Sequence, residues 1–470
     1  MHTIEQIFIN GEFVTPHGTE WFDLYNPATA QVIGQVRLAD EVDAARAIAA
    51  AKAAFPAWSR TTKQERIAAL KRMHAAVAAR HDDLLEAVIE EYGAPASRSA
   101  WMASYPAEVI AQAIEALEAF EFETTAGAAT VQMTPLGVAG LITPWNSDAG
   151  FICGKLAAAL AAGCTAVIKP SEMSALQTQI VTEALRDALP PGVFNIVTGR
   201  GETVGETLSR HPDVAKISFT GSTNTGKAIL RNAAESFKRV TLELGGKSPT
   251  ILLDDVDLAQ AIPLVIQAGF MNSGQACVAG TRILVPQARK AEIEAVLAQA
   301  VAAVKSGDPR DSATDVGPMV SEKQWLRVQG YIRKGLDEGA RLLAGGEGRP
   351  DGTRDGWFVR PTLFADVNNQ MTIARDEIFG PVLCVIPYRD EAEAIAIAND
   401  TEYGLSAMVL SGDADRARRV AQQMVSGRVL VNTLAHEPKA PFGGFKHSGV
   451  GREMGEWGIR AFMEPRSILG

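Results

Sequence analysis

The sequence predicts an α/β fold with two α/β domains and an extended β-hairpin arm. Short β-branched runs alternate with helical segments from about residue 136 to 243, and a second alternating series continues to residue 431. Such alternation is typical of parallel sheets that are covered by helices on both faces. A chain of 470 residues is also long enough for two or three domains.

Short alternating runs near the amino terminus predict small antiparallel strands, one ending at the hairpin-forming pair Asn10-Gly11 and another at Gly34. Further on, apolar residues recur at helical spacing in Ala-rich segments, and Pro56 and Gly93 are expected to end two of the helices. The expected helices cover residues 41–55, 62–80, 83–93 and 105–120.

Two series of strands follow. The first is expected at Val138–Ile142, Thr165–Ile168, Phe194–Val197, Lys216–Phe219 and Val240–Leu242. The second is expected at Thr250–Leu253, Thr281–Val285, Val382–Ile386, Ser406–Leu410 and Val429–Val431. The most apolar uncharged stretch, Leu156–Ile168, has 13 residues, whereas a membrane-spanning helix needs about 20. We therefore expect it in the core, and no membrane association.

The charge-free stretch between Glu123 and Asp148 is rich in Thr, Gly and Pro, and predicts an extended hairpin that leaves and re-enters the first sheet. The tail Arg466–Gly470 can add a strand beside it. Because exposed edge strands usually find a partner, we expect a homodimer or homotetramer; the alternative is a hairpin folded back on its own subunit.

Charge and cysteine usage exclude several classes of protein. With 45 basic and 55 acidic residues the net charge is -10, and no basic run offers a nucleic-acid surface. The cysteines, Cys153, Cys164, Cys277 and Cys384, and the 7 histidines show no metal-binding spacing. We expect no metal, reduced thiols, and a cytoplasmic protein without a targeting segment.

Two turns are candidates for binding a dinucleotide. Gly199-Arg200-Gly201 resembles half of a G-x-G-x-x-G motif, but Val204 stands where the third glycine belongs, so the signal is weak. Thr220-Gly221-Ser222 joins a strand to a helix, and free backbone N–H groups at a helix start attract phosphate. The alternative for Ser222 is an ordinary N-cap.

Lys169 and Glu172 are expected at the carboxyl edge of a strand that Pro170 ends, where α/β sheets place ligands. A carboxylate there can bind both hydroxyls of a ribose and would repel a 2′-phosphate, which favours NAD over NADP. The alternative is a solvated surface ion pair.

Cys277 is the candidate nucleophile because small residues and glycines leave room around its thiol; most lone cysteines are merely small buried hydrophobes. Glu243 closes an apolar strand, where burial should raise its pKa as a water-activating base requires. An ion pair with Lys247 is the alternative. Asn146 can donate to an oxyanion or cap the following helix.

Together these segments resemble the aldehyde dehydrogenase superfamily over essentially the whole chain, and Glu243 points to its non-acylating type, in which water rather than coenzyme A takes the acyl group. Seven motifs occur in the family's order: Ile142-Thr143-Pro144-Trp145-Asn146, Lys169-Pro170-Ser171-Glu172, Phe219-Thr220-Gly221-Ser222, Glu243-Leu244-Gly245-Gly246-Lys247, Gly274-Gln275-Ala276-Cys277, Glu377-Ile378-Phe379-Gly380-Pro381 and Pro441-Phe442-Gly443-Gly444.

The resemblance implies a three-part subunit. Residues 1–117 and 135–243 would form a dinucleotide-binding domain that lacks the usual glycine motif, residues 244–433 a catalytic domain, and residues 118–134 and 456–470 an oligomerisation arm.

It also implies oxidation of an aldehyde to a carboxylic acid with NAD. Cys277 would attack the carbonyl, Asn146 and the Cys277 N–H would stabilise the oxyanion, and Glu243 would activate the water that hydrolyses the thioester. The cofactor residues would be Lys169, Glu172, Gly221, Ser222, Glu377 and Phe379, with Trp145 and Gln324 as weaker candidates.

Departures from the family's pattern lie around the substrate. Ser147-Asp148 replaces an aromatic residue and a proline that many relatives carry, and Gly154 stands where tryptophan is frequent. We predict a wide tunnel for a bulky or aromatic aldehyde. Its expected lining is Phe151, Gly154, Met271, His436 and Phe442.

Two rival functions remain. Cys277 with His436 or His447 as base would make a cysteine esterase or thioesterase without redox chemistry. A binding or structural protein that has lost its catalytic activity is disfavoured, because Asn146, Glu243 and Cys277 are all present.

Overall fold

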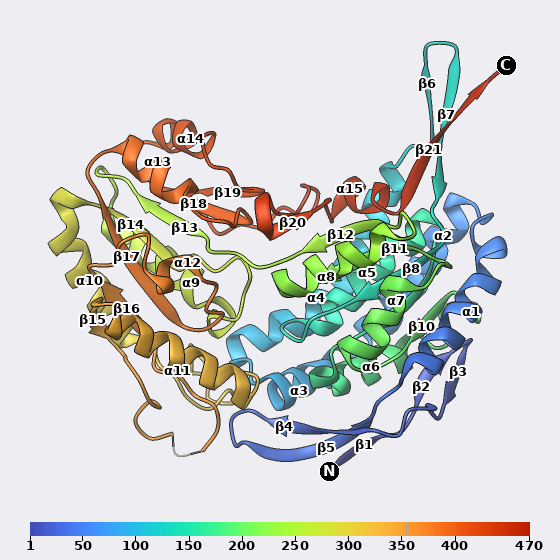
Figure 1. The fold of residues 1–470 in the computed structure, drawn as a ribbon, viewed down its shortest axis with the longest axis horizontal. Coiled ribbons are helices and arrows are strands. Elements are labelled where there is room, and N and C mark those ends of the chain that lie inside the picture. Colours follow the sequence, from blue (N-terminus) through green and yellow to red (C-terminus); the bar gives the residue numbers. More distant parts are fainter. Residues whose placement is uncertain (354) are drawn as a thin grey trace.

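Two large sheets form the centres of two lobes in the computed structural model, which describes residues 1–353 and 355–470 (Figure 1). The first sheet has eight strands in the order β20 (Gly449–Val450), β12 (Arg239–Glu243), β11 (Val214–Thr220), β8 (Val138–Ile142), β9 (Thr165–Lys169), β10 (Phe194–Ile196), β2 (Ile7–Ile9) and β3 (Glu12–Val14). Its five central strands, β8 to β12, run parallel. The first predicted strand series is therefore confirmed.

The second sheet has seven strands in the order β15 (Arg341–Ala344), β16 (Thr362–Ala365), β17 (Val382–Tyr388), β14 (Arg282–Pro286), β13 (Pro249–Leu252), β18 (Ser406–Leu410) and β19 (Arg428–Val431). All pairs are parallel except β15 with β16. The second strand series is confirmed as well.

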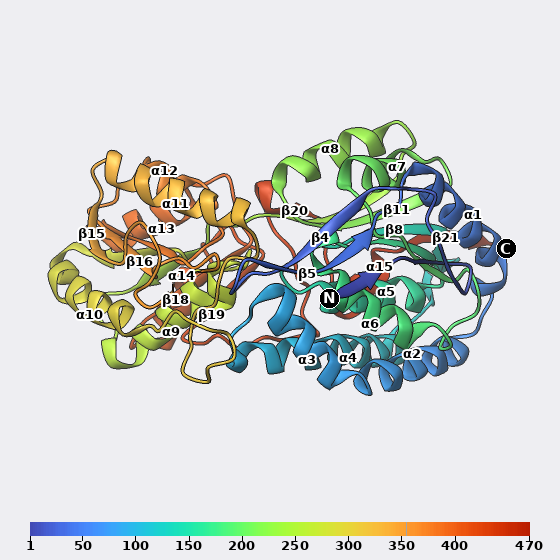
Figure 2. The same cartoon turned by 90° about the horizontal axis from the view of Figure 1, so that it is seen from below.

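Helices cover both faces of the first sheet (Figure 2). One apolar cluster joins the sheet to α2 (Lys63–Ala78), α4 (Ala96–Ala119), α5 (Asp148–Ala162) and α6 (Ala175–Leu185). Another joins the opposite face to α1 (Glu41–Trp58), α7 (Glu206–Arg210) and α8 (Thr223–Ala234). Short elements complete this lobe: α3 (His81–Ala87), η1 (Val88–Tyr92), η2 (Glu172–Ser174) and η3 (Gly201–Gly205).

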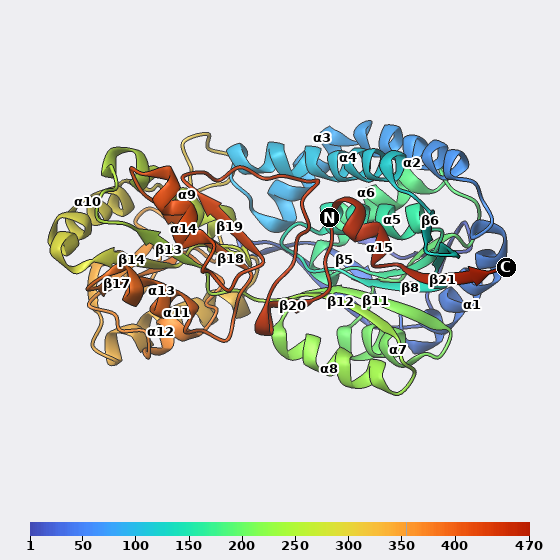
Figure 3. The same ribbon diagram turned by 90° about the horizontal axis from the view of Figure 1, so that it is seen from above.

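The second sheet packs with α9 (Leu258–Phe270), η4 (Met271–Gly274), η5 (Gln287–Arg289), α10 (Lys290–Ala303), α11 (Glu322–Asp337), α12 (Thr372–Arg375), α13 (Glu391–Asn399) and α14 (Ala414–Ala421). After β19 the chain crosses back to the first lobe through η6 (Lys446–Ser448), β20 and α15 (Gly455–Arg460), as Figure 3 shows. No helix in the described residues is long and apolar enough to span a bilayer.

Several local predictions need correction. Pro56 does not end the first helix, which continues to Trp58, and the helix expected from residue 105 begins at Ala96 with Pro106 inside it. A proline removes one helical hydrogen bond, and this loss is tolerated where the helix packs on its neighbours. Gly34 lies within β5 (Gln31–Arg37), not after it. This strand pairs antiparallel with β4 (Trp21–Asn26) but parallel with β1 (His2–Ile4).

The predicted hairpin is present as β6 (Glu123–Ala126) and β7 (Ala129–Pro135), and it projects from the body instead of folding back on it (Figure 1). The chain end forms β21 (Met463–Leu469), which pairs antiparallel with β7 along its whole length. The tail strand is thus confirmed. Within the described residues β6 pairs only with β7, so the other side of β6 is a free edge of the sheet.

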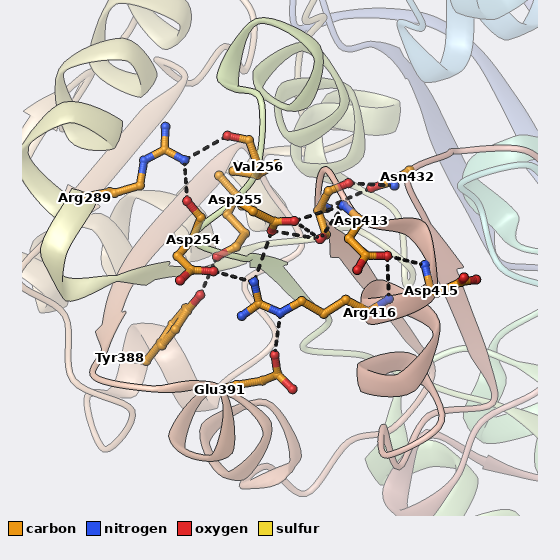
Figure 4. Close-up of polar contacts among 12 residues, drawn as sticks. Asp254, Asp255, Val256, Arg289, Tyr388, Glu391, Asp413, Asp415, Arg416 and Asn432 are labelled. Atoms are coloured by element: carbon orange, nitrogen blue, oxygen red, sulfur yellow. Dashed lines mark hydrogen bonds and ion pairs between the residues drawn. The ribbon is translucent and has the colours of Figure 1, made fainter.

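A polar network holds the place where the chain leaves the second sheet (Figure 4). Asn432 exchanges two hydrogen bonds with the backbone of Ser411, at 3.0 and 2.9 Å. The Ser411 hydroxyl donates to Asp255, and Arg416 pairs with Asp254 and Asp255. The start of the crossing segment is therefore fixed to both β13 and β18.

Candidate active site

Cys277 lies in a loop that follows α9 and the irregular turn η4. Asn272, Ser273 and Gly274 are consecutive residues with left-handed backbone angles, at φ 56°, 60° and 74°. This conformation costs a non-glycine residue roughly 1–2 kcal/mol, so surrounding contacts must hold it. Gly274 has no alternative, because a Cβ there would lie 2.2 Å from the Gly380 carbonyl carbon.

Asn146 is bound to this loop and does not cap a helix. Its side-chain amide donates to the Gln275 carbonyl oxygen at 3.0 Å, and its own carbonyl accepts from the Asn272 amide at 2.9 Å. The N-cap of α5 is Ser147. The tertiary structure thus brings Asn146, from the end of β8, to the residues that precede Cys277.

Glu243 reaches the same place from the end of β12. The segment that follows it packs on the cysteine loop: a Cβ on Gly246 would lie 2.3 Å from the Cys277 carbonyl oxygen. On its other side, a Cβ on Gly443 would lie 2.8 Å from Glu243 Oε1. Only glycine allows the Pro441–Gly444 turn to lie this close to the carboxylate.

Glu243 is an unpartnered buried acid. Neither of its carboxylate oxygens has a hydrogen-bond partner among the described residues. Burial, reinforced by the negative charge of Glu453, raises its pKa well above the ordinary value, and Lys155 acts in the opposite direction. Lys247 makes no contact with it; burial lowers the pKa of that lysine to about 8. The alternative of a Glu243–Lys247 ion pair is therefore wrong.

Sequence reasoning missed Lys155 and Glu453. The Lys155 ammonium is buried, pairs with Glu453 and lies 3.0 Å from the Ser218 hydroxyl. These residues are 298 positions apart, so no local pattern joins them. The one local sign was a lysine directly before the apolar stretch Leu156–Ile168. Its role could not be inferred without the fold.

The Cys277 thiol is protonated at neutral pH in this environment. Burial raises its pKa to about 12, helped by the negative charges of Glu377 and Glu243, while Arg428 acts in the opposite direction. A reacting thiolate therefore needs a proton acceptor or an added positive charge. No hydrogen bond joins the sulfur to a histidine within the described residues; His447 contacts Glu402 instead.

The candidate adenosine-side residues lie together at the carboxyl edge of the first sheet. Lys169 Nζ is 3.4 Å from Glu172 Oε2, and Arg200 Nη1 is 3.3 Å from Oε1. Burial alone would raise the pKa of Glu172, but Lys169 and Arg200 outweigh it, and the pKa is lowered. The pair is largely buried, with 7% and 19% of the side chains exposed, so it is not a solvated surface pair.

The neighbouring helix start fits a phosphate. Ser222 accepts from the Thr225 N–H at 3.2 Å as the N-cap of α8, so the N-cap interpretation is correct and leaves the other free N–H groups available. The buried Thr220 hydroxyl beside it has no hydrogen-bond partner in the part of the chain that the structure describes. A dinucleotide fits this donor set: a carboxylate for a ribose diol, then N–H groups and a hydroxyl for phosphate.

Trp145, Gln324, Glu377 and Phe379 converge from three segments of the chain. The Trp145 and Phe379 rings meet edge to face at 5.4 Å. Gln324 Nε2 donates to the Phe379 carbonyl at 2.7 Å. Glu377 accepts from the Gly246 N–H at 2.9 Å, and burial raises its pKa to about 7. Glu377 therefore contacts the segment that follows Glu243, and Trp145 and Gln324 are joined to it through Phe379.

The expected tunnel lining is spread over several elements. A methyl group would fit at Gly154, because a Cβ there would meet Val109 at an ordinary contact distance of 3.7 Å. Phe151, Met271 and Phe442 are partly exposed, and His436 is exposed. Sequence reasoning missed Arg98, Trp101 and Tyr105 on α4 and Arg428 on β19. Tyr105 packs on Gly150, and the Arg428 guanidinium lies 6.0 Å from the centre of the Phe442 ring.

The chain matches a protein family and a curated relative over almost its whole length. The family model described as "Aldehyde dehydrogenase family" matches residues 13–468. A 3-succinoylsemialdehyde-pyridine dehydrogenase from a Pseudomonas species is 44% identical, with 100% of this chain and 99% of the relative covered.

Solved structures of aldehyde dehydrogenases are also similar to this chain. A mutant of aldehyde dehydrogenase C (AldC) from Pseudomonas syringae, in complex with NAD+ and octanal, matches with a TM-score of 0.98 at 44% identity, covering 100% of this chain and 97% of the other. A Mycobacterium tuberculosis aldehyde dehydrogenase in complex with NAD+ matches with a TM-score of 0.96 at 41% identity, covering 99% and 98%.

Proposed function

The chain belongs to the aldehyde dehydrogenase family, and we propose the roles that its own residues play in the family's reaction. It oxidises an aldehyde to the corresponding carboxylic acid with NAD as the hydride acceptor. One observation supports the site most directly: the Asn146 side chain donates to Gln275 in the cysteine loop, and Gly246, three residues after Glu243, packs against the Cys277 carbonyl, so three distant segments meet at this loop. The family match favours this activity over an esterase without redox chemistry.

Cys277 forms the bond to the substrate. After the thiol proton has passed to water, the thiolate sulfur attacks the aldehyde carbon to give the thiohemiacetal anion, and the Asn146 amide and the Cys277 N–H donate to this oxyanion. When bound, NAD supplies the acceptor for the hydride that leaves this carbon. Loss of hydride turns the thiohemiacetal into a thioester on Cys277.

Glu243 then acts as general base. Its unpartnered carboxylate takes a proton from water, which attacks the thioester and releases the carboxylic acid and the free thiol. The negative charge of Glu453 raises the pKa of Glu243, and the positive charge of Lys155 lowers it. The experiment that tests this scheme measures the formation of reduced nicotinamide from a panel of aldehydes, in the wild-type protein and in Cys277→Ala.

Lys169 and Glu172 would hold the adenosine ribose, the Gly221–Ser222 turn the pyrophosphate, and Glu377 the nicotinamide ribose, with Phe379 near the ring. Trp145 and Gln324 are the weaker candidates for cofactor binding. The geometry that supports this is the convergence of these residues at one edge of the first sheet and beside the Glu243–Gly246 segment.

Replacing Glu172 by Gln should change the choice of cofactor. The carboxylate repels a 2′-phosphate and also neutralises Arg200. Its loss frees the guanidinium to pair with that phosphate, so we expect kcat/KM with NADP to rise at least about 10-fold relative to NAD, about 1.4 kcal/mol. Steady-state kinetics with both cofactors measures the ratio. An unchanged ratio in Glu172→Gln would show that the ribose binds elsewhere.

We propose that the substrate is bulky or aromatic. A glycine at position 154 keeps the α5 surface free of a side chain beside Val109, and the Trp101 and Tyr105 rings stack 4.3 Å apart along the facing helix α4. A relative at 44% identity is named for a pyridine-bearing semialdehyde. Planar substrates gain from such aromatic surfaces.

Filling the space at Gly154 should select against large aldehydes. In Gly154→Trp we expect kcat/KM for an aromatic aldehyde to fall by about 10- to 100-fold relative to acetaldehyde, because overpacking of a fitted cavity costs about 1–3 kcal/mol. The same panel on Gly154→Ala, whose single methyl group the cavity accepts, is the control. Equal losses for both aldehydes would contradict the wide tunnel.

The domain boundaries and the assembly complete the proposal. Residues 1–117 and 135–243 would bind the dinucleotide, residues 244–433 would carry the catalytic cysteine, and residues 118–134 and 456–470 would form the arm. The unpaired edge of β6 in the projecting hairpin supports a homodimer or homotetramer. Four unpaired cysteines support a reducing, cytoplasmic location.

A further inference from the structure

Arg98 on α4 is joined to the cysteine loop by a specific contact. Its Nε donates to the Asn272 side-chain oxygen at 3.1 Å, and its guanidinium carbon lies over the Trp101 ring, 3.7 Å from the ring centre. The charged or polarisable groups that face it are the phenols of Tyr92 and Tyr105, and no carboxylate pairs with it within the described residues. Arg98 is thus oriented by an aromatic face and by one amide.

Asn272 is the centre of this arrangement. Its side-chain oxygen accepts from Arg98, its side-chain amide donates to the Asn146 carbonyl at 2.9 Å, and its own carbonyl accepts from the Tyr92 hydroxyl at 3.3 Å. It does this in a left-handed conformation, which asparagine tolerates better than most residues. One residue therefore connects α4, the Asn146 turn and the cysteine loop.

The remaining bonds close a ring of four residues, Asn272, Asn146, Gln275 and Tyr92. Asn146 donates to the Gln275 carbonyl, and the Gln275 amide lies 3.4 Å from the Tyr92 hydroxyl. The oxyanion donor and the thiol can act on one carbonyl only if their segments keep a fixed separation, because a misplacement of about 1 Å costs on the order of 100-fold in rate. Arg98 and Tyr92 are the two side chains outside the loop that hold Asn272.

We propose that Arg98 is a positioning residue for the oxyanion site: acting through Asn272, it fixes the Asn146 amide relative to the Cys277 thiol. The inference rests on the proposed roles of Asn146 and Cys277. Because Arg98 also stacks on Trp101, which stacks on Tyr105, the same residue links the aromatic wall of α4 to the reacting groups.

The test compares Arg98→Gln, Asn272→Gly and the double variant. Glycine keeps the left-handed backbone of residue 272 without strain while removing the bridge. We expect each single variant to lose about 10- to 100-fold in the rate per active site, counted by burst amplitude, with the NAD dissociation constant changed less than about twofold. The double variant should lose no more than the worse single one, because both break one connection.

Arg72→Gln is the matched control, since Arg72 also donates one bond, to the Ala188 carbonyl at 3.1 Å, far from the site. Hydrolysis of a 4-nitrophenyl ester is measured in parallel, because it uses the thiol and the oxyanion donor without a hydride acceptor. A full rate per active site in Arg98→Gln, or losses that multiply in the double variant, would overturn the inference. A wild-type enzyme that oxidises no aldehyde would instead refute the proposed function, and the ester assay would still decide the role of Arg98.

Discussion

Cys277→Ala is expected to lose at least about four orders of magnitude in aldehyde oxidation, the scale on which removal of a covalent nucleophile acts. The physical reason is that neither Asn146 nor Glu243 can form the carbon–sulfur bond through which both steps pass. Ester hydrolysis should disappear with it, because the same thiol would be acylated. The measurement is formation of reduced nicotinamide, together with mass spectrometry of wild-type protein quenched during turnover.

The quenched wild-type protein should carry the added acyl mass on Cys277. Cys153→Ala is the matched control: Cys153 is a buried thiol on the neighbouring helix α5 and is fully enclosed. This variant should keep its activity and its adduct. An adduct on another residue, or steady oxidation with no adduct at all, would contradict covalent catalysis by Cys277.

Glu243→Gln should separate the two halves of the reaction. Glutamine keeps the shape of the side chain but cannot accept a proton, so thioester formation proceeds while hydrolysis slows by about 10²- to 10⁴-fold. A pre-steady-state burst of reduced nicotinamide, close to one per active site, should therefore remain while turnover falls. Rapid-mixing absorbance measures both. Loss of the burst would mean that Glu243 acts before hydride leaves, for example by deprotonating Cys277.

The pH dependence of turnover gives a second readout for Glu243. Burial and Glu453 raise the pKa of its carboxyl, and only the deprotonated form is a base. Wherever hydrolysis limits turnover, kcat should rise with pH through this raised pKa, and the rise should be absent in Glu243→Gln. In Glu453→Gln a negative neighbour is lost and Lys155 is left unpaired, so the rise should move to lower pH. A shift to higher pH would contradict this electrostatic arrangement.

The sequence predicted the elements well where local signals agree. Alternating β-branched runs located ten of the eleven parallel strands of the two sheets and missed β16, and Asn10-Gly11 marked a true hairpin turn. It failed where packing outweighs local preference: Pro56 and Pro106 lie inside helices that neighbouring elements hold. The sequence also offered no sign that β1 pairs in parallel with β5, because the two strands are separated in the chain by β2, β3 and β4.

The residues of the candidate site also fall into those that the sequence predicted and those that it did not. Cys277, Glu243, Asn146 and Glu172 were identified because motifs carry their residue type and their place at a strand end or loop. Lys155, Glu453 and Arg98 were not, because each is meaningful only through a partner 174 or more positions away. Their roles come from charge and distance in three dimensions.

The sequence by itself determined the family, the order of strands and helices, and which side chains can carry the chemistry, since these depend on residue type and short spacing. Only the tertiary structure decided that the Glu243 carboxylate has no hydrogen-bond partner among the described residues, that burial raises the pKa of the Cys277 thiol, and that Asn272 connects Asn146 to Arg98. These properties arise from burial and from contacts between distant segments, and both exist only once the two sheets have been brought together.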